Sequence, residues 1–173
     1  MRELARELDV PVMTLYNHVR NKDDLSVLVV DHILRPVQIP AESTGSWQER
    51  VRTLERDARQ ALAKHPGISI RNGVRSTEAI RLADGVVSIL TSSGFDQADA
   101  IRMFAVLYTF MLGQVEVDGF FATAQSGGEP TFENVVSGEQ RDELFEFGFD
   151  VLLRGLEAAV STGPAAPPAP TRK

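Results

Sequence analysis

Residues 12–25 read VMTLYNHVRNKDDL and hold a short helical pattern, a break and the start of a further helix. Before them, residues 2–8 read RELAREL, which also has the apolar spacing of a short helix. Asp9 lies in the turn between the two patterns, where aspartate can adopt a left-handed conformation, and Pro11 suits the start of a helix. Two short helices joined by a tight turn predict a helix-turn-helix, whose second helix lies in the major groove of DNA.

An apolar seam is expected between these two helices. Its members are Leu4, Leu8, Val10, Leu15 and Val19. Ala5 is small at the point where the helices must approach closely. Because two helices alone leave one apolar side uncovered, we expect the complete DNA-binding unit to have a further helix upstream of Met1.

Charge on this unit is close to balanced. Residues 1–24 carry four basic side chains and five acidic ones: Arg2, Arg6, Arg20 and Lys22 against Glu3, Glu7, Asp9, Asp23 and Asp24. Phosphate neutralisation supplies most nonspecific affinity for DNA, so this face alone is expected to bind DNA weakly. Either the true start lies upstream, which we favour, or the chain has lost competent DNA binding.

The rest of the sequence predicts an all-α fold. The expected helices are 21–34, 46–64, 76–93, 96–122 and 137–160. Ser46 and Ser137 each begin a capping-box pattern, and Gly94 is expected to end a helix in a left-handed conformation. Residues 125–130 are predicted to be a loop.

Composition disfavours several classes of protein. The 173 residues have a formal net charge of -6, no cysteine, no signal-peptide pattern and no apolar run typical of a membrane helix. We therefore expect a cytoplasmic protein with no membrane partner. The three histidines, His18, His32 and His65, do not have metal-ligand spacing, and no glycine-rich phosphate loop occurs. Neither an enzyme, a metal nor a cofactor is predicted.

The last two predicted helices are apolar on more than one side, which favours burial against a second chain. The expected interface residues are Leu144, Phe145, Phe149, Leu152 and Leu156. Two helices from each subunit would form a four-helix interface in a homodimer. The alternative is that both helices lie in the interior of a monomer.

Residues 2–34 resemble the tetracycline-repressor (TetR) family of bacterial regulators. The segments that carry this resemblance are LAREL at 4–8, TLYNHV at 14–19 and KDDL at 22–25. The resemblance implies a helix-turn-helix with its connecting helix over 1–35, a linker over 36–45 and a helical ligand-binding and dimerisation domain over 46–160. A proline- and alanine-rich tail over 161–173 is expected to be disordered.

The resemblance also implies DNA contacts. Val12, Met13 and Thr14 are expected at base edges, where a threonine methyl can pack on a thymine methyl. Tyr16 and His18 are expected to contact phosphates, with Lys22 adding a charged contact, and such contacts fix position and not sequence. Without the motif, Tyr16 could be a residue at the edge of the core, and His18 and Lys22 ordinary surface side chains.

A TetR-type regulator usually binds a small molecule between the helices of its larger domain, and this tilts the connecting helix, here residues 22–34. The expected pocket residues are Leu54, Ala58, Arg71, Asn72, Val87, Met103, Leu107, Phe110, Met111 and Gln114. Because Arg71 would repel a cation, a magnesium-chelated drug is disfavoured and an apolar or anionic ligand is expected.

The predicted function is that of a ligand-responsive transcriptional regulator, a repressor released from its operator DNA by a small-molecule effector. The alternative is a dimeric ligand-binding protein that has lost DNA binding.

Overall fold

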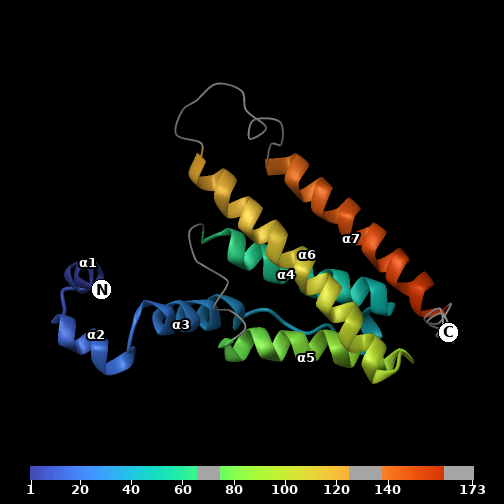
Figure 1. The fold of residues 1–173 in the computed structure, drawn as a ribbon, viewed down its shortest axis with the longest axis horizontal. Helices are drawn as coiled ribbons and strands as arrows, with labels where there is room; N and C mark the ends of the chain where they lie inside the picture. The colour runs from blue at the N-terminus through green and yellow to red at the C-terminus, as the bar shows by residue number, and fades with distance from the viewer. Residues whose placement is uncertain (66–74, 125–137, 162–173) are drawn as a thin grey trace, which may run out of the picture.

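The computed structural model describes residues 1–65, 75–124 and 138–161, and within these ranges every regular element is helical. The elements are α1 (Arg2–Glu7), α2 (Val12–His18), α3 (Lys22–Leu34), η1 (Glu42–Thr44), α4 (Trp47–Ala63), α5 (Thr77–Ser92), α6 (Gln97–Ala124) and α7 (Gly138–Ser161). The predicted all-α fold is confirmed. Figure 1 shows α1 and α2 at one end of α3, with α4 to α7 gathered toward its other end.

Local hydrogen bonds explain where most helices begin. The side chain of Asn21 accepts from the Asp24 amide at the start of α3, and that of Ser76 accepts from the Ala79 amide at the start of α5. Ser46 and Glu49 form the predicted capping box of α4, in which each side chain bonds the other's backbone amide. These bonds satisfy amides that have no partner within the helix.

Two details differ from the sequence prediction. The expected linker contains one short element, the 3₁₀ helix η1, and α6 extends to Ala124, two residues beyond its predicted end. Gly94 has the expected positive φ, at 100°. The predicted loop at 125–130, the capping serine at 137 and the tail after 161 lie outside the described residues.

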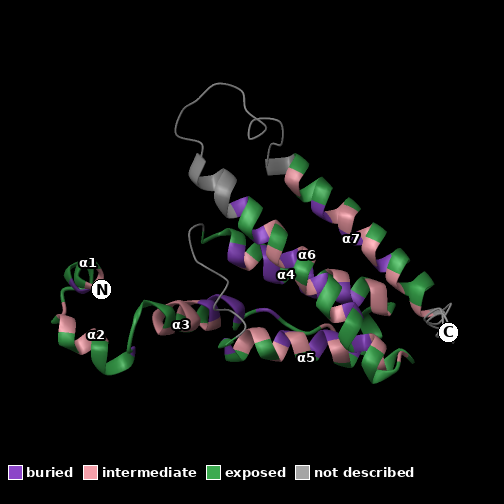
Figure 2. Cartoon of the chain, viewed as in Figure 1, coloured by how far each residue is buried: buried purple, intermediate pink, exposed green. Residues whose placement is uncertain are grey.

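Helix α6 is at the centre of the larger domain, where it packs on α4, α5 and α7. Figure 2 shows buried positions facing one another across these helices. The most deeply buried large side chains include Leu54, Leu90, Leu107, Phe145 and Phe149. Although no membrane segment is expected from the sequence, the Gln97–Asp118 part of α6 is long and apolar enough to be a candidate span by length and composition alone. Within the described residues, 28% of this segment is buried by the rest of the chain.

A buried ion-pair network joins α4, α6 and α7. The Arg59 guanidinium lies 2.9 Å from a carboxylate oxygen of Asp118 and 2.7 Å from one of Asp142. The same guanidinium stacks 4.8 Å from the centre of the Phe145 ring. Because a buried charge without partners is costly, this network favours one relative placement of the three helices.

Candidate functional site

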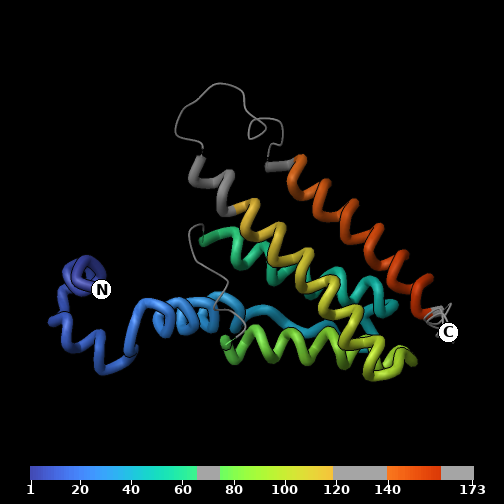
Figure 3. The backbone as a smooth tube through the Cα atoms, in the orientation of Figure 1, coloured from blue at the N-terminus to red at the C-terminus, as the bar shows by residue number. Residues whose placement is uncertain are grey.

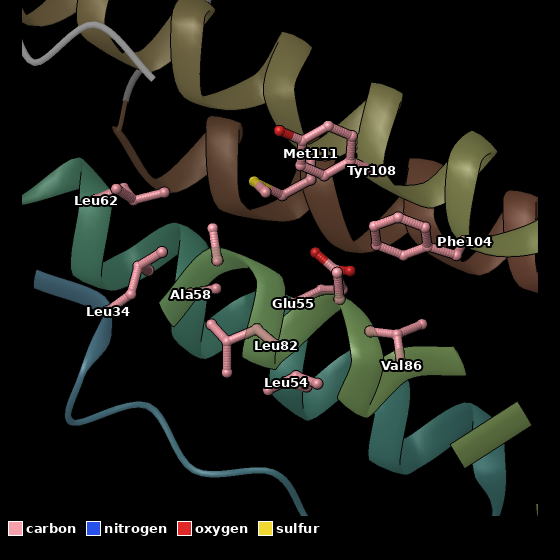
Figure 4. A pocket seen from close by; sticks show the side chains of 12 residues that line it. Leu34, Leu54, Glu55, Ala58, Leu62, Leu82, Val86, Phe104, Tyr108 and Met111 are labelled. Carbon is pink, nitrogen blue, oxygen red and sulfur yellow. The ribbon is translucent and has the colours of Figure 1, made fainter. Parts of the chain in front are cut away.

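A small cavity lies between α3, α4, α5 and α6 (Figure 4). Its free space is about 40 Å³, and its lining is mostly apolar. The lining residues are Leu34, Leu54, Glu55, Ala58, Leu62, Ala79, Leu82, Ala83, Val86, Phe104, Tyr108 and Met111. Sites for drug-sized ligands typically measure roughly 300–1,000 Å³, so a ligand of that size requires the surrounding helices to separate.

Glu55 is the charged residue of this lining. Its side chain projects from α4 among the apolar residues of the cavity wall (Figure 4), and the residue is only 5% exposed. Burial raises the pKa of the Glu55 carboxyl to about 7, because a carboxylate in an apolar surrounding loses its hydration. Within the described residues no hydrogen bond or ion pair engages this carboxyl. Glu55 is therefore a buried acidic residue whose carboxyl faces the cavity with no hydrogen-bond or ion-pair partner among the described residues.

The pocket residues expected from the sequence fall into several groups. Leu54, Ala58 and Met111 line the cavity, whereas Met103 and Leu107 are buried in the core outside its lining. The remaining expected residues do not line it either: Phe110 stacks on Phe145 of α7, Val87 and Gln114 are half-buried elsewhere, and Arg71 and Asn72 lie outside the described residues.

Sequence reasoning missed Glu55, although its helix carries a signal. The buried face of α4 includes Val51, Leu54, Ala58 and Leu62. Glu55 lies four residues after Val51 and three before Ala58, so helical periodicity places it on that same apolar face. An acidic residue on a buried face indicates a structural partner or a site, and no partner is present among the described residues.

Helix α3 forms part of the cavity wall and is hydrogen-bonded to the start of α5. Leu34 at its C-terminal end contributes to the lining. One turn earlier, the Asp31 carboxylate accepts a 2.6 Å hydrogen bond from the Ser76 hydroxyl and a 2.9 Å bond from the Glu78 amide. Asp31 therefore binds the N-terminal end of α5, where unpaired amides favour a negative charge. A shift of α5 relative to α4 must move or strain α3.

The other end of α3 leads to the α1–α2 pair, which Figure 3 shows projecting away from the larger domain. Asp9 has the expected left-handed backbone, with φ 51°, and Ala5 and Val19 are buried in the seam between helices. Leu8 differs from its expected place in that seam, because 56% of it is exposed.

The six expected DNA contacts divide by exposure. Met13 and Tyr16 are 70% and 46% exposed, and His18 and Lys22 are exposed as well. Val12 and Thr14 are half-buried. All six lie on α2 or at the first residue of α3.

The larger domain has a recognisable family pattern. Residues 39–137 match the family model described as the tetracyclin repressor-like C-terminal domain, which is more than half of the chain. The chain belongs to the TetR family.

Curated relatives agree with this assignment to the TetR family. An HTH-type transcriptional regulator of Saccharopolyspora erythraea is 28% identical over 74% of this chain and 56% of its own length. The HTH-type transcriptional repressor DrrR1 of Streptomyces coeruleorubidus is 30% identical over 96% of this chain and 73% of its own length. The chain thus spans little more than half of the first relative and about three quarters of the second.

Solved structures of TetR-family proteins have the same fold. A possible TetR family transcriptional regulator from Streptomyces coelicolor A3(2) superposes with a TM-score of 0.77 and 28% identity, over 91% of this chain and 88% of that chain. ActR from Streptomyces coelicolor, in complex with actinorhodin, superposes with a TM-score of 0.69 and 25% identity, over 91% of this chain and 86% of that chain. BioQ with its double-stranded DNA operator superposes with a TM-score of 0.67 and 26% identity, over 91% of this chain and 85% of that chain.

The interface residues expected for this TetR-family chain lie on two sides of α7. Phe145 and Phe149 are buried within the subunit, where both rings pack against Phe110 of α6. Leu152 and Leu156 are half-buried against the same core. Leu144 is on a different side and is 49% exposed. The side of α7 that is available to another molecule is therefore the one that carries Leu144.

Proposed function

We propose that this TetR-family chain is a ligand-responsive transcriptional regulator, a repressor that reads operator DNA with α2 and is released by a small molecule bound between α3, α4, α5 and α6. The observation that carries the proposal is the position of Leu34. This residue lines the cavity and ends the helix that leads to α2, so the cavity and the DNA-reading unit share one structural element.

The DNA-reading part rests on the exposed residues of α2. Met13 and Thr14 lie in its first turn, the part of a recognition helix that reaches base edges in this motif. Tyr16 and Lys22 lie further along, where a hydroxyl and an ammonium group suit phosphate oxygens. The names of the relatives, which include HTH-type regulators and a repressor, support this role.

The release mechanism follows from the size of the cavity. A drug-sized ligand needs several times the free space present, so its binding must separate α5 or α6 from α4. Leu34 and Asp31 transmit that movement to α3. A dimer of this kind reads half-sites about 34–36 Å apart. A small rotation of α3 in each subunit is therefore enough to change the spacing of the two DNA-reading units so that they no longer match the half-sites.

The proposed repressor is a homodimer formed through α6 and α7. On α7 the exposed apolar residues Leu144, Phe147 and Val151 are spaced three and four residues apart and share one face. Val106 and Val117 of α6 are 41% and 43% exposed, and helical spacing puts both on the same side of α6 as Phe110, which packs on α7. The symmetric partner for such a face is a second copy of this chain, giving a four-helix contact.

Selection from a random library of DNA duplexes tests the DNA-reading part. We expect enrichment of a two-fold symmetric sequence. The Tyr16→Ala variant should weaken binding to all sequences alike, and Tyr16→Phe should show how much of that loss comes from the hydroxyl. Thr14→Ala should instead change the preference at one base pair, by about 1–3 kcal/mol.

A dimeric ligand-binding protein without DNA binding is the second candidate, and the balanced charge of residues 1–24 favours it. Four basic side chains against five acidic ones supply little attraction to phosphates. If selection enriches no sequence while a ligand still binds in the cavity, this second function replaces the first.

A further inference from the structure

Building on the effector site proposed above, we propose that Glu55 is the polar anchor of the cavity and that the effector is a largely apolar molecule carrying a protonated amine. The inference rests on the position of the Glu55 carboxyl at an apolar cavity. Glu55 is a residue that is only 5% exposed, its carboxyl faces a cavity whose other walls are almost wholly apolar, and no described side chain pairs with it.

A ligand cation gains more at this position than at a surface carboxylate. Folding has already placed the carboxyl among apolar side chains, so an ammonium group that enters the cavity favours its ionised form and meets a poorly hydrated acceptor. Charge-assisted hydrogen bonds of this kind are about twice as strong as those between neutral groups. The amine therefore supplies a partner that no side chain in the described part of the chain provides.

The aromatic residues of the wall favour the same ligand. Phe104 and Tyr108 stack with their ring centres 5.5 Å apart, and both line the cavity. Aromatic faces attract cations and pack well on flat apolar bodies. The cavity thus offers a negative group together with an apolar, aromatic surface, which fits a cationic amphiphile.

An anionic effector does not fit the described lining, which has no basic side chain. Arg59 lies one turn from Glu55 on α4, but its guanidinium is held by Asp118 and Asp142 outside the cavity. This differs from the apolar or anionic ligand that Arg71 suggests in the sequence. Arg71 lies outside the described residues, whereas Glu55 is in the cavity wall.

Three probes of one shape test the inference: 1-naphthylmethylammonium, 1-naphthylmethanol and 1-naphthoate. Their affinities for the full chain are measured by calorimetry, with Glu55→Gln as the test variant and Asp57→Asn as the control. Asp57 is an exposed acid on the same helix and does not line the cavity. We expect the parent and the control to bind the ammonium probe at least tenfold more tightly than the alcohol. Glu55→Gln should lose that preference and keep its affinity for the alcohol.

A pH series gives a second readout. Tyr108 is the other titratable residue that faces the Glu55 carboxyl, since α3 and α5 contribute only apolar side chains to the described lining. Burial, and then the charge of Glu55, raise the pKa of Tyr108, so this phenol stays neutral near pH 7. Affinity for the ammonium probe should fall as the pH drops below 7 in the parent, because Glu55 gains a proton, and should stay constant in Glu55→Gln.

Several results would overturn the inference. These are equal affinity for the ammonium and alcohol probes, a preference that survives in Glu55→Gln, tighter binding of the naphthoate, or no binding of the ammonium probe at millimolar concentration. Release from the selected DNA is measured separately. If the alcohol binds and releases DNA without any preference for the amine, the anchor is wrong and the regulator function stands. If probes bind and DNA is never released, the regulator function fails instead.

Discussion

Glu55 places an acidic side chain where folding alone favours an apolar one. It shares the inner face of α4 with Val51, Leu54 and Ala58, and all four are buried. A carboxyl in such a surrounding is stable mainly in its protonated form, which raises its pKa to about 7. This residue therefore connects the stability of the domain to pH.

The Glu55→Gln variant tests how far Glu55 makes the stability of the chain depend on pH. The pKa is about 4.5 for the ordinary group and about 7 in the folded chain, so the folded state binds the proton more tightly. The free energy of unfolding of the parent, relative to Glu55→Gln, should therefore fall as the pH rises from 4.5 to 7 and level off above it. The expected total is about 3 kcal/mol. Urea unfolding at a series of pH values measures it, and a difference that does not change with pH would contradict the shifted pKa.

Gly148 shows how closely α6 and α7 approach. A Cβ atom added at this position would lie 2.7 Å from the tip of the Phe110 ring, which is also packed against Phe145 and Phe149. A ring held in this way cannot move aside freely, so the close approach of the two helices depends on the absence of a side chain at residue 148.

We therefore expect Gly148→Ala to lower the free energy of unfolding by about 1–3 kcal/mol, as overpacking does in other cores. Gly155→Ala on the same helix is the matched control, since a Cβ there would meet nothing within 4 Å. That change should be neutral or stabilising, by up to about 1 kcal/mol, because alanine favours helices. Equal effects of the two substitutions in thermal unfolding would be inconsistent with the packing described.

At the scale of elements, the junction between α3 and α5 links the two ends of the molecule. Asp31 bonds Ser76 and the Glu78 amide in a half-buried position. A second contact, between Asp24 of α3 and Arg75, which precedes the cap of α5, is exposed at Arg75, where the side chain is 61% accessible. We expect the Asp31 hydrogen bonds to stabilise the chain much more than the Arg75–Asp24 ion pair, because solvent weakens exposed ion pairs.

Asp31→Ala should accordingly destabilise the chain by about 1–2 kcal/mol, the usual cost of losing a capping acceptor at a helix N-terminus. It should also weaken the coupling between cavity and DNA, so that a bound ligand releases less of the selected DNA. Arg75→Ala is the control and should change stability by less than about 1 kcal/mol. The measurements are urea unfolding and ligand titration of the protein–DNA complex. An Asp31→Ala variant with normal stability, from which the ligand still releases all the DNA, would exclude coupling through Asp31.

At the scale of the whole molecule, the exposed apolar face of α7 predicts a dimer. Phe147 is 69% exposed and Val151 is 52% exposed, and they lie one turn apart. Phe147→Glu should therefore shift the protein to a monomer in sedimentation, because it places a charge at the centre of the contact. Gln60→Glu puts the same charge on an exposed part of α4 and should leave the dimer intact. A parent chain that sediments as a monomer, or a Phe147→Glu variant that stays dimeric, would contradict the proposed face.

The helices and their boundaries could be predicted because their causes are local. Asn21, Ser46 and Ser76 each bond an amide three residues later, and Asp9 adopts its left-handed turn within a few residues of Pro11. The helix-turn-helix motif is equally local, so its residues indicate the TetR family without reference to any tertiary contact. These features depend on neighbours in sequence, which a reader of the sequence can see.

Only the tertiary structure decided which apolar residues face which partner. Met103 and Phe104 are adjacent in α6, yet Met103 is in the core and Phe104 lines the cavity. Leu144 and Phe145 are adjacent in α7, yet one is exposed and the other stacks on Phe110. A helix that is apolar on several sides does not specify its own rotation, because that depends on contacts with distant helices. For the same reason the sequence determined that Glu55 lies on an apolar face, and only the packing of α3, α5 and α6 around α4 left its carboxyl facing a cavity.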